Sequence, residues 1–168
     1  AGLPGGGGAW PVPHDAARVG RAGSHSAYRP RGVVAGLGDG GRAPVVASAA
    51  VGAAVHRGAR VRFVQVIPAG LTAEDRSEMD GAMFGVALRA LHRQRRVPCT
   101  FETVEGDAAR MLVDRSTGAA VLVVGRDSPA AVVRVGQYCQ EHALCDVLTV
   151  LGPDSQLEPA GHTTRATG

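Results

Sequence analysis

The sequence predicts a doubly wound α/β domain, with a five-stranded parallel sheet and helices on both faces. Short apolar runs alternate with longer segments in which apolar residues recur at helical spacing. The run AAVLVVG at 119–125 is continuously apolar, as expected of a parallel strand covered on both faces. The alternation repeats from residue 32 to residue 152, and this order favours parallel strands joined by crossover helices.

The first half of this region holds two expected strands, 32–37 and 60–66, each followed by a helix. Pro44 lies in the first turn of the helix that runs to His56, and glycine follows its end. A second helix is expected to begin after Thr72, in a variant of the capping box, and to end in the basic segment 93–96.

The second half is expected to hold the strands 99–104, 119–125 and 145–151. Asp107 is placed to cap a helix that ends before Gly118. Pro129 is expected to open the last helix, which continues to Glu141 or His142.

The flanks of this region have a different composition. Residues 1–31 are rich in glycine and proline and lack hydrophobic periodicity, and residues 153–168 are similar. Such segments cannot bury enough surface to offset the entropy of ordering them. We therefore expect a flexible leader at 1–31, an α/β domain at 32–152 and a flexible tail at 153–168.

Composition excludes several classes of function. All 18 basic residues are arginine, which excludes lysine Schiff bases and phosphate loops that need a lysine. Residues 33–152 carry thirteen arginines and twelve acids, and aromatic residues make up 4% of the chain, so we expect no nucleic-acid partner. No run is long enough to cross a membrane. The histidines lack metal-ligand spacing, and we expect no metal site.

Three cysteines stand at positions 99, 139 and 145. An odd number without regular spacing does not make a disulfide framework, and a protein of the cytoplasm is the expectation that follows. We interpret the three thiols as buried and structural, because redox sensing requires exposure and a lowered pKa.

Ligands of doubly wound sheets bind beyond the carboxyl ends of the strands. Two glycine-containing loops follow strong strands here, one at 36–41 and one at 125–129. If the first and fourth strands are neighbours, both loops line one crevice, where glycine lets a backbone approach a phosphate closely. The alternative is that both are ordinary strand-to-helix turns, since a fold alone does not give a function.

Three segments resemble the universal stress protein family. VVAGLGDGG is similar to its first strand and loop, VEGDAARMLVDRSTGAAVLVVG to its third helix and fourth strand, and EHALCDVLTV to its last segment. The resemblance covers residues 32–152. It implies the strand order 3-2-1-4-5, which places the first and fourth strands side by side. It also implies a homodimer that pairs the last strand, Val147 to Leu151, with its copy.

Members of that family either bind ATP or do not, and this chain departs from the binding pattern. The pattern is glycine, two residues, glycine, nine residues, and glycine followed by a small hydroxyl or amide residue. Gly125 matches its first position, but Ser128 stands at the second. Gly136 arrives too early for the third, and Gln137 follows it.

The first loop departs as well, because alignment of the strand puts Gly38 where the family has aspartate, with Asp39 one residue later. If a nucleotide binds, Gly36, Gly38 and Gly125 are the expected positions of close backbone approach. Asp39 is then the expected ribose or adenine contact, and Gly125 with Gly136 are the expected phosphate contacts. In the second loop Asp127 repels phosphate, and Pro129 has no N–H group to donate. We therefore expect ATP to bind weakly or not at all.

The resemblance implies a dimeric regulatory or stress-response domain. No residue pattern identifies a catalytic group, so an enzyme is the less favoured interpretation. The alternative is an enzyme or small-molecule-binding protein on the same fold, with the crevice adapted to another ligand.

Overall fold

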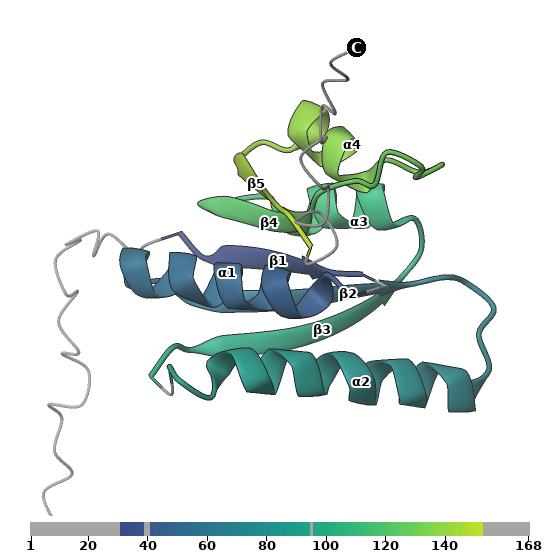
Figure 1. Ribbon diagram of the computed structural model, residues 1–168, viewed down its shortest axis with the longest axis horizontal. Coiled ribbons are helices and arrows are strands. Elements are labelled where there is room, and N and C mark those ends of the chain that lie inside the picture. The colour runs from purple at the N-terminus through teal and green to yellow at the C-terminus, as the bar shows by residue number, and fades with distance from the viewer. Residues whose placement is uncertain (1–30, 39–40, 95, 153–168) are drawn as a thin grey trace, which may run out of the picture.

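The computed structural model describes residues 31–38, 41–94 and 96–152, which Figure 1 shows in colour. Residues 1–30 and the segment 153–168, which the sequence predicts to be flexible, lie outside these ranges. Asp39, the expected ribose or adenine contact, lies outside them too.

Strands and helices alternate through the described residues, in the order that the sequence predicts. The elements are β1 (Val33–Leu37), α1 (Ala43–Arg57), β2 (Val61–Ile67), α2 (Ala73–Leu91), β3 (Cys99–Glu105), α3 (Ala108–Arg115), β4 (Val121–Gly125), α4 (Val135–His142) and β5 (Asp146–Val150).

The five strands form one parallel sheet in the order β3-β2-β1-β4-β5. The expected fold class and strand order are therefore confirmed. Val33 of β1 is in register with Val61 on one side and Val121 on the other. Because β1 and β4 are neighbours, the loops that follow them start at the same edge of the sheet.

The helices cover the sheet from both sides, two on each face (Figure 1). Val33, Ala35 and Leu37 of β1 belong to the core beneath α1 and α2. Val34 points to the other face and packs in a second core with Leu112 of α3 and Cys139 of α4. Alternate residues of one strand thus serve two cores, which explains why β1 is apolar along its whole length.

Two helix starts follow the local signals in the sequence. The hydroxyl of Thr72 accepts a hydrogen bond from the Asp75 N–H at 3.1 Å, and the Asp107 carboxylate accepts one from the Arg110 N–H at 2.9 Å. Both residues are N-caps, as predicted.

The predicted start of the last helix is wrong. Pro129 does not open a helix; the chain makes a turn there, in which the Ala131 N–H donates to the Ser128 carbonyl at 2.9 Å. Helix α4 begins six residues later, at Val135. The position of its start is set by a side chain from before the turn, described below.

The cysteine prediction is correct for one thiol. Cys139 is completely buried, but Cys99 is exposed because it begins the edge strand β3, and Cys145 is half-buried. Burial raises the pKa of the Cys139 thiol to about 11, with smaller contributions from Asp127 and Cys145.

Candidate functional site

A cavity of about 380 Å³ opens at the carboxyl edge of the sheet. It lies between the loops that follow β1 and β4, which is where the sequence predicts a crevice. Four of the predicted site residues line it: Gly36, Gly38, Gly125 and Ser128. Of the other three, Gly136 and Gln137 line a neighbouring depression, and Asp39 lies outside the described residues.

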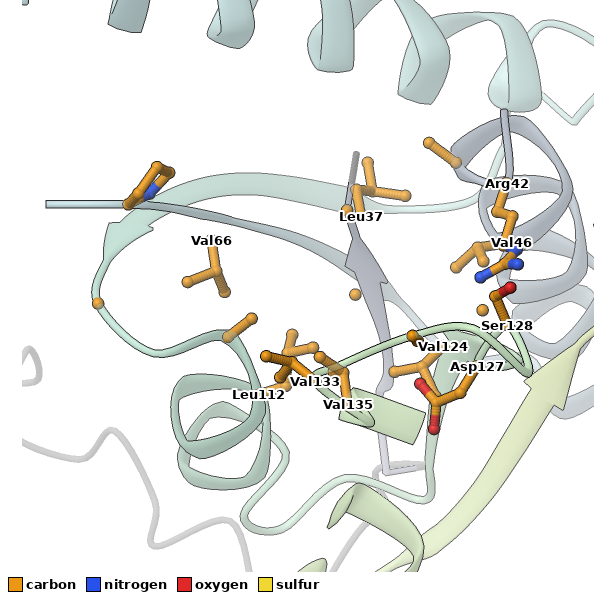
Figure 2. Close-up of a pocket in the computed structure, with 18 residues that line it drawn as sticks. Leu37, Arg42, Val46, Val66, Leu112, Val124, Asp127, Ser128, Val133 and Val135 are labelled. Atoms are coloured by element: carbon orange, nitrogen blue, oxygen red, sulfur yellow. The ribbon is translucent and has the colours of Figure 1, made fainter. Parts of the chain in front are cut away.

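The cavity has an apolar end and a polar end (Figure 2). Val66, Leu112, Val133 and Val135 gather at one end, from β2, α3 and the segment before and at the start of α4. The other end carries the charged side chain of Arg42 and the hydroxyl group of Ser128, together with Val46.

The carboxylate of Asp127 is bound to the start of α4. One oxygen accepts from the Gly136 N–H at 2.9 Å, and the other accepts from the Gln137 N–H at 2.8 Å. The N–H groups in the first turn of a helix have no partners within the helix and attract anions. Asp127 is therefore an internal anion at the start of α4, and its role is to cap this helix.

Asp127 occupies donors that the resemblance assigns to phosphate. The sequence predicts that Gly125 and Gly136 are the positions that a nucleotide phosphate would approach. A Cβ built on Gly136 would lie 3.2 Å from an oxygen of the Asp127 carboxylate. The space beside Gly136 thus already contains a negatively charged group of the chain itself.

Two of the glycines serve packing within the fold. A Cβ on Gly36 would lie 2.8 Å from one methyl carbon of Leu112 and 3.2 Å from Val124. The absence of a side chain at Gly36 therefore lets α3 pack closely on β1. A close approach of a nucleotide to Gly36 stays a prediction. Gly38 is exposed, and a Cβ there would meet nothing within 4 Å.

The side chain of Arg42 lies across two glycines at the ends of β4 and β5. A Cβ on Gly125 would be 3.2 Å from its Cδ, and a Cβ on Gly152 would be 2.8 Å from its Cγ. Within the described ranges the Arg42 guanidinium makes no ion pair and no hydrogen bond. The absence of side chains at these two glycines therefore leaves room for the Arg42 side chain at the polar end of the cavity.

Sequence reasoning identified neither Arg42 nor Gly152 as part of the site. Arg42 precedes α1, while the two glycines that it contacts lie at the end of β4 and just after β5. No local pattern connects positions this far apart in the chain, and only the strand order brings them together. The signal in the sequence that could have indicated this contact is the presence of glycines at the ends of two strands that the strand order places side by side.

No group of three or more histidine, cysteine or acidic side chains suited to a metal ion occurs among the described residues. Over the same residues, no helix is both long and apolar enough to cross a membrane.

Comparison with solved structures identifies the fold. The chain is similar to a universal stress protein from Archaeoglobus fulgidus, with 20% identity and a TM-score of 0.60 over 71% of this chain and 92% of that one. The described domain has the universal stress protein fold.

Two further structures of this fold match at similar coverage. A universal stress protein family protein from Arabidopsis thaliana, solved with AMP bound, shares 17% identity with a TM-score of 0.55 over 78% of this chain and 97% of that one. A member from Burkholderia pseudomallei shares 27% identity with a TM-score of 0.51 over 73% of this chain and 97% of that one. No family model matches the sequence, and no curated protein does.

Proposed function

We propose that residues 32–152 form a regulatory, stress-response domain of the universal stress protein type that binds ATP weakly or not at all. The domain acts in the cytoplasm and has no catalytic group of its own. The observation that carries the proposal is the contact of the Asp127 carboxylate with the N–H groups of Gly136 and Gln137.

The size of the loss in ATP affinity follows from that contact. A hydrogen bond to a charged group contributes roughly 1.5–3 kcal/mol. A phosphate that finds two such donors occupied forgoes both bonds and lies near a like charge. Two lost contacts weaken binding by a factor on the order of a hundred or more. Arg42 is one cation and cannot balance a triphosphate with its several negative charges.

Titration calorimetry with ATP and magnesium tests this proposal. We expect no binding, or a dissociation constant well above the low-micromolar range, from a protein whose circular dichroism shows an intact α/β domain. A dissociation constant at or below the low-micromolar range would contradict the proposal.

We propose that the domain forms a homodimer through residues Val147 to Leu151. This segment covers most of β5, which lies at an edge of the sheet. Leu148 is 45% exposed and Leu151 is 49% exposed. An apolar edge strand promotes association unless it is paired or covered, and two-fold symmetric dimers are the most common oligomers.

Sedimentation equilibrium tests the dimer. Leu148→Arg is expected to shift the mass from dimer toward monomer, because it places a charge in the paired edge. Val55 of α1 is 46% exposed and offers a matched control: Val55→Arg should leave the dimer intact. A wild-type protein that sediments as a monomer at micromolar concentration would refute the proposal.

A second candidate function is the binding of another small molecule in the cavity. The segregated apolar end, formed by Val66, Leu112, Val133 and Val135, favours it. Mass spectrometry of ligands released from freshly purified protein separates the candidates. An adenine nucleotide would contradict weak ATP binding, whereas a different organic molecule would support a changed ligand.

A further inference from the structure

We propose that the cavity binds a small organic acid with an apolar body and a single carboxylate, held by the guanidinium of Arg42. This inference rests on the second candidate function, small-molecule binding in the same cavity, and names its class of ligand. It follows from the size of the cavity, from the separation of its lining into two ends, and from the way Arg42 is held.

The size and lining fit the apolar part of such a molecule. The volume of about 380 Å³ lies near the lower limit of small-molecule sites, which span roughly 300–1,000 Å³. The lining at one end is aliphatic, from Val66, Leu112, Val133 and Val135. Val133 is 63% exposed, so a ligand that covers it removes apolar surface from water, which favours binding.

The polar end fits one negative charge. Arg42 stands at the N-cap of α1, and the first turn of this helix contains no acidic residue. A cation at the positive end of a helix dipole is unfavourable, so a bound anion would relieve this repulsion. The guanidinium presents paired N–H donors that match the two oxygens of a carboxylate.

The aliphatic part of the Arg42 side chain is packed in the absence of a ligand. It lies against the backbone of Gly125 and Gly152, which limits the conformations that the side chain can adopt. An arginine that is already held in place loses less entropy when it binds an anion. The two glycines are thus positioning residues for the guanidinium.

The same end is unsuited to an anion of higher charge. Asp127 also lines the cavity, so its negative charge lies near the ligand site. The other arginines near this edge, Arg126 and Arg134, line the neighbouring depression and are exposed. Among the residues that the structure describes, Arg42 is the one cation in the cavity lining, and a single carboxylate matches its charge.

Titration of the full chain with sodium octanoate, followed by amide NMR, tests the proposal. We expect saturable shifts of residues at the cavity, such as Val46, Val124 and Ser128, and a weaker response to 1-octanol, which lacks the charge. Arg42→Gln should weaken octanoate binding at least tenfold and leave octanol binding unchanged. The control Arg126→Gln should bind octanoate as the wild type does.

A second variant tests the positioning of Arg42. Gly152→Ala brings a Cβ within 2.8 Å of the Arg42 Cγ, so it should displace the guanidinium and weaken octanoate several-fold. Gly81→Ala is its control, because Gly81 lies in α2, away from the cavity, and its Cβ would meet nothing within 4 Å.

The outcomes separate this inference from the proposed loss of ATP binding. If octanoate causes no saturable shifts, or if Arg42→Gln binds it as well as the wild type does, the inference is refuted. ATP titrated separately reports on the other proposal, which stands or fails on its own dissociation constant. If octanoate shifts spread over the whole surface, binding is nonspecific and the inference is likewise refuted.

Discussion

Replacement of Asp127 by alanine tests the central structural observation of the site. In the wild type the carboxylate accepts two hydrogen bonds, at 2.9 Å from the Gly136 N–H and at 2.8 Å from the Gln137 N–H. Asp127→Ala removes both acceptors and leaves the start of α4 without a cap. The variant should therefore be less stable than the wild type.

The burial of the two donors sets the size of the effect. Gly136 is buried, so its N–H loses a charge-assisted bond with poor access to water, at a cost of roughly 1.5–3 kcal/mol. Gln137 is exposed, so water replaces the carboxylate there at little cost. We expect a total loss near 2 kcal/mol, at the upper end of the range of about 0.5–2 kcal/mol for N-cap substitutions.

Urea denaturation followed by circular dichroism measures this loss as a lower midpoint at unchanged slope. Asp127→Asn keeps one acceptor oxygen and should lose about half as much stability. Asp114, exposed in the last turn of α3, provides the control, since Asp114→Ala should change the free energy of unfolding by less than about 0.5 kcal/mol.

The N–H groups of Gly136 and Gln137, left without the carboxylate in Asp127→Ala, should also bind a dissolved anion. We expect inorganic phosphate to raise the midpoint of Asp127→Ala in proportion to site occupancy and to leave the wild type unaffected. If Asp127→Ala is as stable as the wild type, or if phosphate stabilises both proteins equally, the assignment of Asp127 as an internal anion is wrong.

Three further predictions follow from packing and titration. Gly36→Ala forces a Cβ to within 2.8 Å of a Leu112 methyl carbon and should cost roughly 1–3 kcal/mol by overpacking, whereas Gly38→Ala should be neutral in the same urea titration. The pKa of the Cys139 thiol is raised from 9.0 to about 11 in the folded state, so the thiol loses its proton at a lower pH in the unfolded chain than in the folded one. The free energy of unfolding should therefore fall between about pH 9 and about pH 11. Cys139→Ala should abolish that part of the pH dependence. Iodoacetamide should label the exposed Cys99 quickly in the native protein and Cys139 only after unfolding.

Local signals predicted much of the fold. Thr72 and Asp107 cap their helices through residues three positions later in the chain, so their role is readable from a few residues. Gly58 adopts a positive φ of 61° just after α1, as a helix stop signal implies. The order of the strands followed from a resemblance, and periodicity alone would not have given it.

What could not be predicted depends on contacts between distant parts of the chain. The start of α4 was misplaced at Pro129 because its cap, Asp127, lies before the intervening turn. Asp127 was interpreted as a charge that repels a ligand, since nothing nearby in the sequence shows which N–H groups it would meet. Arg42 was missed because the glycines that it packs against lie far away in the sequence, one at the end of β4 and the other just after β5.

Asp127 has one more consequence, which concerns whether dissolved anions can bind at the start of α4. The carboxylate is tethered to its donors by the short intervening segment 128–135, and a short tether gives a group an effective concentration on the order of millimolar. A dissolved anion must outcompete this permanent neighbour before it reaches the same N–H groups. If ATP binds weakly, as proposed, helix α4 keeps its cap whether nucleotides in the surrounding solution are abundant or scarce, and its first turn does not respond to their concentration.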